Sequence, residues 1–235
     1  MTGASSRDER TPDQPAEPAP GDHDPELVVD RRLTRRGVQL LAGLVLFSAS
    51  IGMIVHSGLG NMPWDVLGQG VAVHLGWTLG TTTLVLSVLV LACWFPLRQR
   101  PGAGTIANVV VIGLLVDPFL ALLDLLPADL DTAGRVALVV GGIALNGVAS
   151  GLYIGARLGP GPRDGLMTGL VARTGRPVHL VRTSIEVLVV AVGWVLGGTV
   201  GLATLAYALC IGPLVHLLLP RLTVPQRPAG PVPGR

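Results

Sequence analysis

The chain of 235 residues has few of the residues that build a soluble enzyme. Charged residues make up 14% of the sequence and aromatic residues 4%, whereas 49% of the residues are hydrophobic. The mean hydropathy of +0.59 is too high for an ordinary soluble domain of this length. The shortage of charge therefore argues against a soluble globular protein. It predicts that the chain is embedded in a lipid bilayer.

The sequence also lacks the residue patterns of metal and catalytic sites. Cys93 and Cys210 lie far apart in apolar runs, so we interpret them as small core residues rather than as a disulfide or metal pair. There is no CxxC or HExxH spacing and no nucleophile with a base near it in a motif. The sequence therefore predicts no metal, no cofactor, no nucleic-acid partner and no enzymatic activity.

Both ends of the chain are polar. Residues 1–34 are rich in Pro, Asp and Glu, and residues 221–235 are rich in Arg and Pro. Such segments bury too little apolar surface to fold, so we expect two disordered tails. The first segment contains no apolar run, which argues against a signal peptide. The membrane domain is expected to span residues 35–220.

Six apolar segments have the roughly 20 residues that a helix needs to cross a bilayer. Two further segments, beginning at Asp65 and Asp164, end near glycines after about 12 residues, or roughly 18 Å of helix. They are too short to cross alone. The six expected spans are approximately 36–56, 79–97, 104–124, 135–156, 179–198 and 202–220.

The arginines predict how these spans are oriented, because cytoplasmic loops retain basic residues. In a model with six spans and a cytoplasmic amino terminus, four arginine clusters fall on the cytoplasmic side. One precedes span 1, and the others follow spans 2, 4 and 6. Arg135 is left outside, near Asp124 and Asp131. We therefore expect a multi-pass protein of a bacterial plasma membrane with both termini in the cytoplasm.

The sequence repeats itself with an offset of 99 residues. Residues 36–120 align with residues 135–219 without a gap, and the matches include glycine, proline and aspartate, which chance does not match between two apolar stretches. Each repeat (36–124 and 135–220) holds three spans, an odd number, so the second copy should lie inverted. The expected fold is an all-α membrane protein of six transmembrane helices in two inverted three-helix repeats, each with a short re-entrant or interfacial helix. This arrangement recurs among secondary transporters.

The matched stretches GNMPWDVLGQGV and GPGPRDGLMTGL begin the two short helices. Proline stands two residues before Asp65 and Asp164, which places both carboxylates in a first helical turn. One interpretation is that they cap the orphan backbone N–H groups of the helices. The other is that the two helix starts line a polar cavity and bind a substrate or ion.

The residue before each aspartate differs between the copies. Trp64 suits an interfacial belt on the outside, whereas Arg163 suits the cytoplasmic side, where it could pair with Asp164 or with an anionic headgroup. Arg182 and Glu186 form an i, i+4 pair in the fifth span. The pair is either mutually satisfied within the bundle or includes a protonatable carboxylate that couples proton movement to transport. Asn108, Asn146, Asp117 and His216 are interpreted as helix-to-helix hydrogen-bonding residues.

The stretches PWDVLGQG at 63–70, GLYIGARLG at 151–159 and GPGPRDGLMTGL at 159–170 resemble the YczE/YyaS/YitT family of bacterial membrane proteins. The resemblance covers the hydrophobic region, about four fifths of the chain. Longer members of the wider group carry a soluble carboxy-terminal domain that has no counterpart here, so the chain is similar to the short YczE-like branch. The resemblance implies a membrane location, and transport or export only loosely.

These observations predict an inner-membrane transporter or exporter of an unidentified small molecule or ion. The alternative is a membrane scaffold or assembly factor that moves no substrate and serves a partner protein. The candidate binding residues are Asp65, Asp164, Arg163, Trp64, Glu186 and Arg182. The two functions differ in one structural respect, which is whether the two short helices begin at a shared polar cavity.

Overall fold

The computed structural model describes residues 25–127 and 130–224 of the chain, with side chains from residue 33 onward. The described residues form α-helices joined by short loops, and no strand occurs among them. The all-α prediction is confirmed for this part of the chain. The helices are α1 (Pro25–Ser57), α2 (Pro63–Leu75), α3 (Leu79–Ala92), α4 (Trp94–Leu97), α5 (Ala103–Leu123), α6 (Thr132–Gly155), α7 (Pro162–Thr174), α8 (Val178–Val195) and α9 (Leu202–Leu222).

Six segments are long and apolar enough to cross a membrane, and they coincide with the six predicted spans. α3 and α4 together make one of them, from Leu79 to Leu97. Many large apolar side chains on these helices are exposed on the outside of the bundle, among them Leu114, Leu202 and Val195. Apolar exposure on this scale is characteristic of a surface that contacts lipid rather than water.

Two helix ends differ from the predicted boundaries. α1 begins at Pro25 rather than near residue 35, and α9 ends at Leu222 rather than at residue 220. Proline at the first helical position is compatible with a helix start, which explains how a charged segment can extend α1. Residues 1–24 and 225–235 of the two predicted tails lie outside the described residues.

The helices of the two halves follow the 99-residue spacing. α2 and α7 begin and end at positions 99 residues apart, and so do α5 and α9. Gly76 and Gly175, which follow α2 and α7, both have a φ of 65° and so both end their helix in the left-handed conformation that glycine adopts at low cost. The sequence repeat is therefore also a repeat of helix lengths and helix ends.

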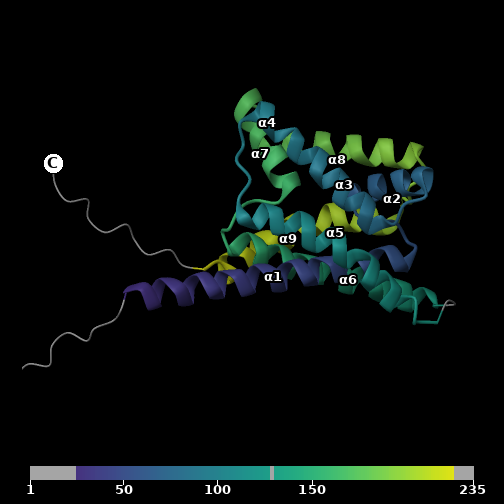
Figure 1. Ribbon diagram of the computed structural model, residues 1–235. Coiled ribbons are helices and arrows are strands. Elements are labelled where there is room, and N and C mark those ends of the chain that lie inside the picture. Colours follow the sequence, from purple (N-terminus) through teal and green to yellow (C-terminus); the bar gives the residue numbers. More distant parts are fainter. Residues whose placement is uncertain (1–24, 128–129, 225–235) are drawn as a thin grey trace, which may run out of the picture.

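α1 and α6 pack against each other along one side of the bundle, with α5 packed on α1 and α9 packed on α6 (Figure 1). α2, α3, α7 and α8 lie on the side of α5 and α9 that faces away from α1 (Figure 1). The buried apolar core lies mainly between α1, α5 and α6, and includes Leu44, Ile51, Ile54, Ile112, Val116 and Ile143.

Two matched glycines allow α1 and α6 to approach closely. A Cβ atom on Gly43 would lie 2.8 Å from the backbone nitrogen of Tyr153, and one on Gly142 would lie 2.6 Å from Ile54 Cγ1. Neither position has room for a side chain. Small residues at such crossings stabilise membrane helix pairs through close backbone packing.

The two halves also contact each other in reciprocal pairs. Arg36 Nε donates to the carbonyl oxygen of Ala156 at 2.7 Å. Its counterpart Arg135 donates through Nε to the carbonyl oxygen of Ser57 at 2.6 Å. Likewise, the backbone amide of Gly104 donates to the carbonyl oxygen of Leu158 at 2.8 Å. The matching bond runs from the amide of Ala203 to the carbonyl of Leu59, at 3.0 Å. Each of these two bonds of the first half thus has its counterpart 99 residues away.

Replacing Gly102 by alanine should weaken this junction between the halves. The added Cβ would lie 2.5 Å from the carbonyl oxygen of Leu158, a backbone atom that cannot turn aside. Overpacking of this kind costs about 1–3 kcal/mol. Thermal unfolding of the purified protein in detergent should show the loss, whereas Gly37→Ala, whose Cβ meets nothing within 4 Å, should leave the melting temperature unchanged or raise it. Equal melting temperatures for the two variants would contradict the packing described here.

Candidate substrate cavity

A cavity of about 360 Å³ lies between the two halves, at the starts of α2 and α7. Residues of α1, α3, α5, α6, α8 and α9 complete its wall. The helix starts contribute Met62, Pro63, Trp64, Gly161, Pro162, Arg163 and Asp164. The two short helices therefore do begin at one shared cavity, as the binding interpretation of the sequence required.

The local sequence explains why α2 and α7 start there. Met62 and Gly161 are extended, with ψ values of 151° and 159°, and proline occupies the first helical turn after each of them. Proline fixes φ near the helical value and lacks an N–H that would need a partner at this position. Both helices have 13 residues, which confirms the prediction of two short helices.

Asp65 and Asp164 lie in the first helical turns, as predicted, but they do not cap them. Neither helix has a side-chain hydrogen bond at its amino end. Asp164 instead accepts a hydrogen bond from the hydroxyl of Tyr153 on α6. Asp65 is 1% exposed, and neither of its carboxylate oxygens has a hydrogen-bond donor among the described residues. The capping interpretation is therefore wrong for both aspartates.

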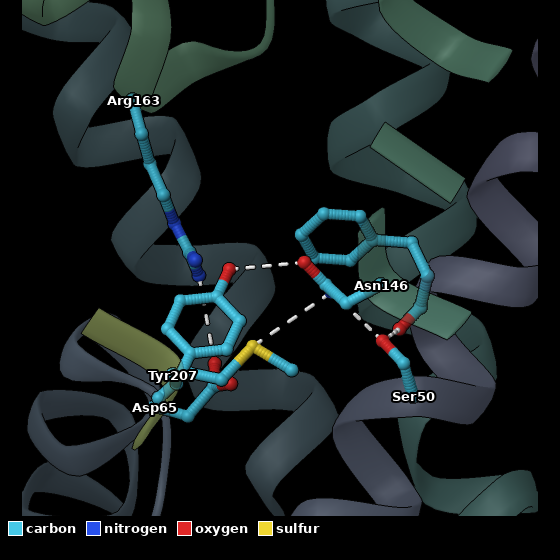
Figure 2. A network of polar contacts seen from close by, with 7 residues as sticks. Ser50, Asp65, Asn146, Arg163 and Tyr207 are labelled. Carbon is cyan, nitrogen blue, oxygen red and sulfur yellow. Dashed lines mark hydrogen bonds and ion pairs between the residues drawn. The ribbon is translucent and has the colours of Figure 1, made fainter. Parts of the chain in front are cut away.

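Arg163 of α7 lines the cavity and reaches Asp65 of α2, which is not one of the lining residues. Their atoms Nη2 and Oδ1 are 3.6 Å apart (Figure 2). The guanidinium carbon of Arg163 also lies 5.2 Å from the ring centroid of Trp64. Arg163 pairs with Asp65 and not with Asp164, so the predicted pair with Asp164 is wrong, whereas contact with a headgroup stays a prediction. Because α2 and α7 start face to face, the buried carboxylate of the other half is the one that Arg163 neutralises.

The charge of Asp65 depends on this arginine. The short helix α2 is not one of the six spans, yet Asp65 is buried, and burial raises the pKa of its carboxyl group. The nearby Arg163 guanidinium lowers that pKa again by a smaller amount. Burial disfavours a charged carboxylate, whereas an adjacent cation favours it. Burial is the larger of the two effects, so the pKa of Asp65 stays above its ordinary value despite the arginine.

The predicted pair of Arg182 and Glu186 is confirmed and lies in the cavity wall. Arg182 Nε donates to Glu186 Oε1 at 2.9 Å, one helical turn along α8. The matched residues of the first half, Thr83 and Ser87 on α3, line the cavity as well. The wall is therefore charged on the α8 side and hydroxylic on the α3 side.

A buried polar network around Asn146 joins the cavity to α1. Asn146 Nδ2 donates to Ser50 Oγ at 2.8 Å and contacts Met62 Sδ at 3.8 Å, while its Oδ1 accepts from the Tyr207 hydroxyl at 3.0 Å (Figure 2). The predicted hydrogen-bonding role of Asn146 is confirmed. A fully satisfied network of this kind fixes side chains that would be costly to bury alone.

Two tyrosines belong to the site although the sequence did not predict them. Tyr153 and Tyr207 are the two tyrosines of the chain, and both line the cavity. A signal for them existed, since a phenol within an apolar span needs a hydrogen-bond partner when it is buried. The repeat did not reveal them, because their matched residues are Ile54 and Asn108.

Two matched helix pairs beside the cavity are packed differently: α3 with α5 in the first half, and α8 with α9 in the second. In the first half α3 packs against α5: the amide of Gly80 donates to Asp117 Oδ1 at 2.8 Å, and a Cβ on Gly113 would lie 2.7 Å from Leu84 Cβ. In the second half the matched helices α8 and α9 are not packed in this way. Gly212, the counterpart of Gly113, meets nothing within 4 Å and lines the cavity together with His216.

The cysteines are free, as expected, but they are not core residues. Cys93 and Cys210 are both exposed. The core prediction failed because an apolar run in a membrane protein also faces lipid, which is as apolar as the protein interior. Within residues 25–127 and 130–224, no group of three or more His, Cys, Asp or Glu side chains is placed to hold a metal ion.

Comparison with known proteins relates the chain to bacterial membrane proteins. The model of a family described as a family of unknown function, DUF6198, matches residues 34–220. An uncharacterized protein of Haemophilus influenzae is 39% identical over 181 residues, which are 77% of this chain and 81% of the relative. No solved structure matches the chain significantly.

Two Bacillus subtilis proteins are also similar. The uncharacterized membrane protein YczE is 30% identical over 193 residues, 81% of this chain and 88% of the relative. The uncharacterized protein YyaS is 24% identical over 179 residues, 76% of this chain and 89% of the relative. Together with the six apolar helices, these likenesses identify an integral, multi-pass membrane protein and confirm the resemblance seen in the sequence.

Proposed function

We propose that this chain, which belongs to the DUF6198 family of membrane proteins, is a secondary transporter or exporter and that the cavity is its substrate site. One observation carries the proposal: matched helix pairs around the cavity are packed in the first half and apart in the second. A scaffold needs one arrangement of the helix pairs around the cavity, whereas a transporter that opens to each side in turn needs two. Here both packings occur side by side in one chain.

The reciprocal contacts between the halves support an inverted arrangement. In a two-fold relationship, a contact from residue i to residue j is accompanied by one from j to i. The pairs Arg36 with Ala156 and Arg135 with Ser57 have this form. Because each half holds three spans, an approximate two-fold axis between them lies in the membrane plane. Inverted repeats with short helices at a central site are typical of secondary transporters.

The arginine distribution supports a bacterial plasma membrane location with both termini in the cytoplasm. In that orientation the contact between Gly80 and Asp117 lies on the outer side of the cavity. Their counterparts His179 and His216 lie on the cytoplasmic side, where α8 and α9 are apart. The structure then corresponds to a state that is closed to the outside and open to the cytoplasm.

Transport follows if the two halves exchange these packings. α8 would close on α9, bringing Thr183 to Gly212, while α3 would leave α5 and separate Leu84 from Gly113. Because the halves match in sequence, the two states have similar contacts and can differ little in free energy. Such an exchange around a central site is alternating access. We propose transport rather than catalysis on this basis.

Labelling of one cavity residue from both sides of the membrane tests this function. Ser87 lines the cavity and is partly exposed, and Ser87→Cys changes one atom of its side chain. The exposed Cys93 and Cys210 are first replaced by serine. In vesicles of known sidedness, an impermeant maleimide should react with Ser87→Cys from either side.

Leu125→Cys, at an 81% exposed position after α5, should react from the outside alone, which also checks the orientation. If Ser87→Cys reacts from one side alone while Leu125→Cys behaves as expected, the cavity does not change sides. A static membrane scaffold would then replace the transporter.

A further inference from the structure

We propose that the cavity takes a substrate with one positively charged nitrogen, such as an organic amine or quaternary ammonium compound, and that this group docks at Asp164. The proposal rests on the proposed function of the cavity as a substrate site. It adds the chemical class of the substrate and names the residue that selects it.

The charged side chains at the cavity leave one carboxylate without a cationic partner. Arg163 is paired with Asp65, and Arg182 is paired with Glu186. Asp164 is the remaining lining carboxylate. Its partner is the Tyr153 hydroxyl, and among the described side chains no arginine or histidine nitrogen lies within 4.0 Å of it.

With both arginines neutralised, the site carries one negative charge in excess. Asp164 is partly buried, and a charge withdrawn from water is costly unless it is paired. A monovalent cation in the cavity would remove that cost, whereas an anion would have to displace a carboxylate from one of the arginines.

The helix starts do not offer an alternative anion site. The positive ends of α2 and α7 point toward the cavity, and such ends commonly bind anions. Here each helix carries its own aspartate in the first turn. An anion at either start would lie beside one of these carboxylates, and like charge disfavours it there.

The remaining wall suits the body of an organic cation. Phe47 and Tyr153 pack edge to face, with their ring centroids 6.1 Å apart, and Tyr207 lies on the opposite helix α9. Aromatic rings attract cations through their electron-rich faces, as Trp64 already does with Arg163. The volume of about 360 Å³ is in the range of small-molecule sites, roughly 300–1,000 Å³.

Three probes that share a benzyl group but differ in charge test the proposal. Benzyltrimethylammonium, benzyl alcohol and phenylacetate are titrated into the purified full-length protein by calorimetry. We expect benzyltrimethylammonium to bind at least about tenfold more tightly than either other probe. Asp164→Asn should weaken the cation about tenfold or more, whereas Asp164→Glu, which keeps the charge, should retain most of the affinity.

The matched control is Asp124→Asn, because Asp124 lies at the end of α5 beside His56 and does not line the cavity. It should bind the cation like the unchanged protein. Preference for phenylacetate, equal binding of all three probes, or unchanged cation binding by a folded Asp164→Asn variant would each overturn the proposal. So would the absence of cation binding. None of these results affects the two-sided labelling of Ser87→Cys, which judges transport separately.

Discussion

Truncating Arg163 to alanine is expected to lower the free energy of unfolding by about 3 kcal/mol, because the buried carboxyl group of Asp65 loses its charged partner and must either stay charged alone or take up a proton. Asp65 is 1% exposed, and its carboxylate oxygens have no hydrogen-bond donor among the described residues to take the place of the arginine. The side chain of Arg163 is 29% exposed, so its own desolvation is partial. Denaturant unfolding of the purified protein in mild detergent measures the loss.

Two further variants identify the cause of that loss. Adding Asp65→Asn to Arg163→Ala removes the orphaned charge and should restore a large part of the stability. Arg182→Ala serves as the matched control, because its partner Glu186 is 26% exposed and can be solvated. If Arg163→Ala is no less stable than Arg182→Ala, the ion pair between the halves does not hold the cavity together.

A disulfide between Thr183→Cys and Gly212→Cys should form although α8 and α9 lie apart. Thr183 is exposed and Gly212 meets nothing within 4 Å, whereas their counterparts Leu84 and Gly113 are in contact. A disulfide requires Cβ atoms about 3.5–4.5 Å apart, so oxidation can only trap a state in which α8 has closed on α9. In the background without native cysteines, mass spectrometry after mild oxidation should detect the bond.

The pair Leu84→Cys with Gly113→Cys is the matched control. In this structure, a Cβ on Gly113 would lie 2.7 Å from Leu84 Cβ, so a small outward shift of α3 brings the two cysteines to disulfide distance. This second bond should form readily and trap the state described here. Failure of the 183–212 bond, with the 84–113 bond formed, would mean that the second half never adopts the packing of the first.

Most of the fold was predictable because its causes are local. Span lengths follow from apolar runs, and the short helices follow from a proline at the start and a glycine at the end of each 13-residue segment. The start of α1 at Pro25 was not predictable, since a charged segment with helix-forming residues gives no apolar signal.

The site was predictable in part, because the repeat shows which residues correspond but not which ones meet. Asp65, Asp164 and the pair of Arg182 with Glu186 were found from their unusual place in apolar surroundings. The partner of Arg163 was missed, since pairing across the two halves depends on how they pack. Tyr153 and Tyr207 were missed because their roles have no counterpart in the first half.

The exchange of packing between the halves is tested most directly by the side from which Ser87→Cys can be labelled in each of the two cross-linked proteins. With the 84–113 disulfide in place, an impermeant maleimide should react from the cytoplasmic side alone. With the 183–212 disulfide in place, it should react from the outside alone. Reaction from the same side in both cross-linked proteins would contradict alternating access through this cavity.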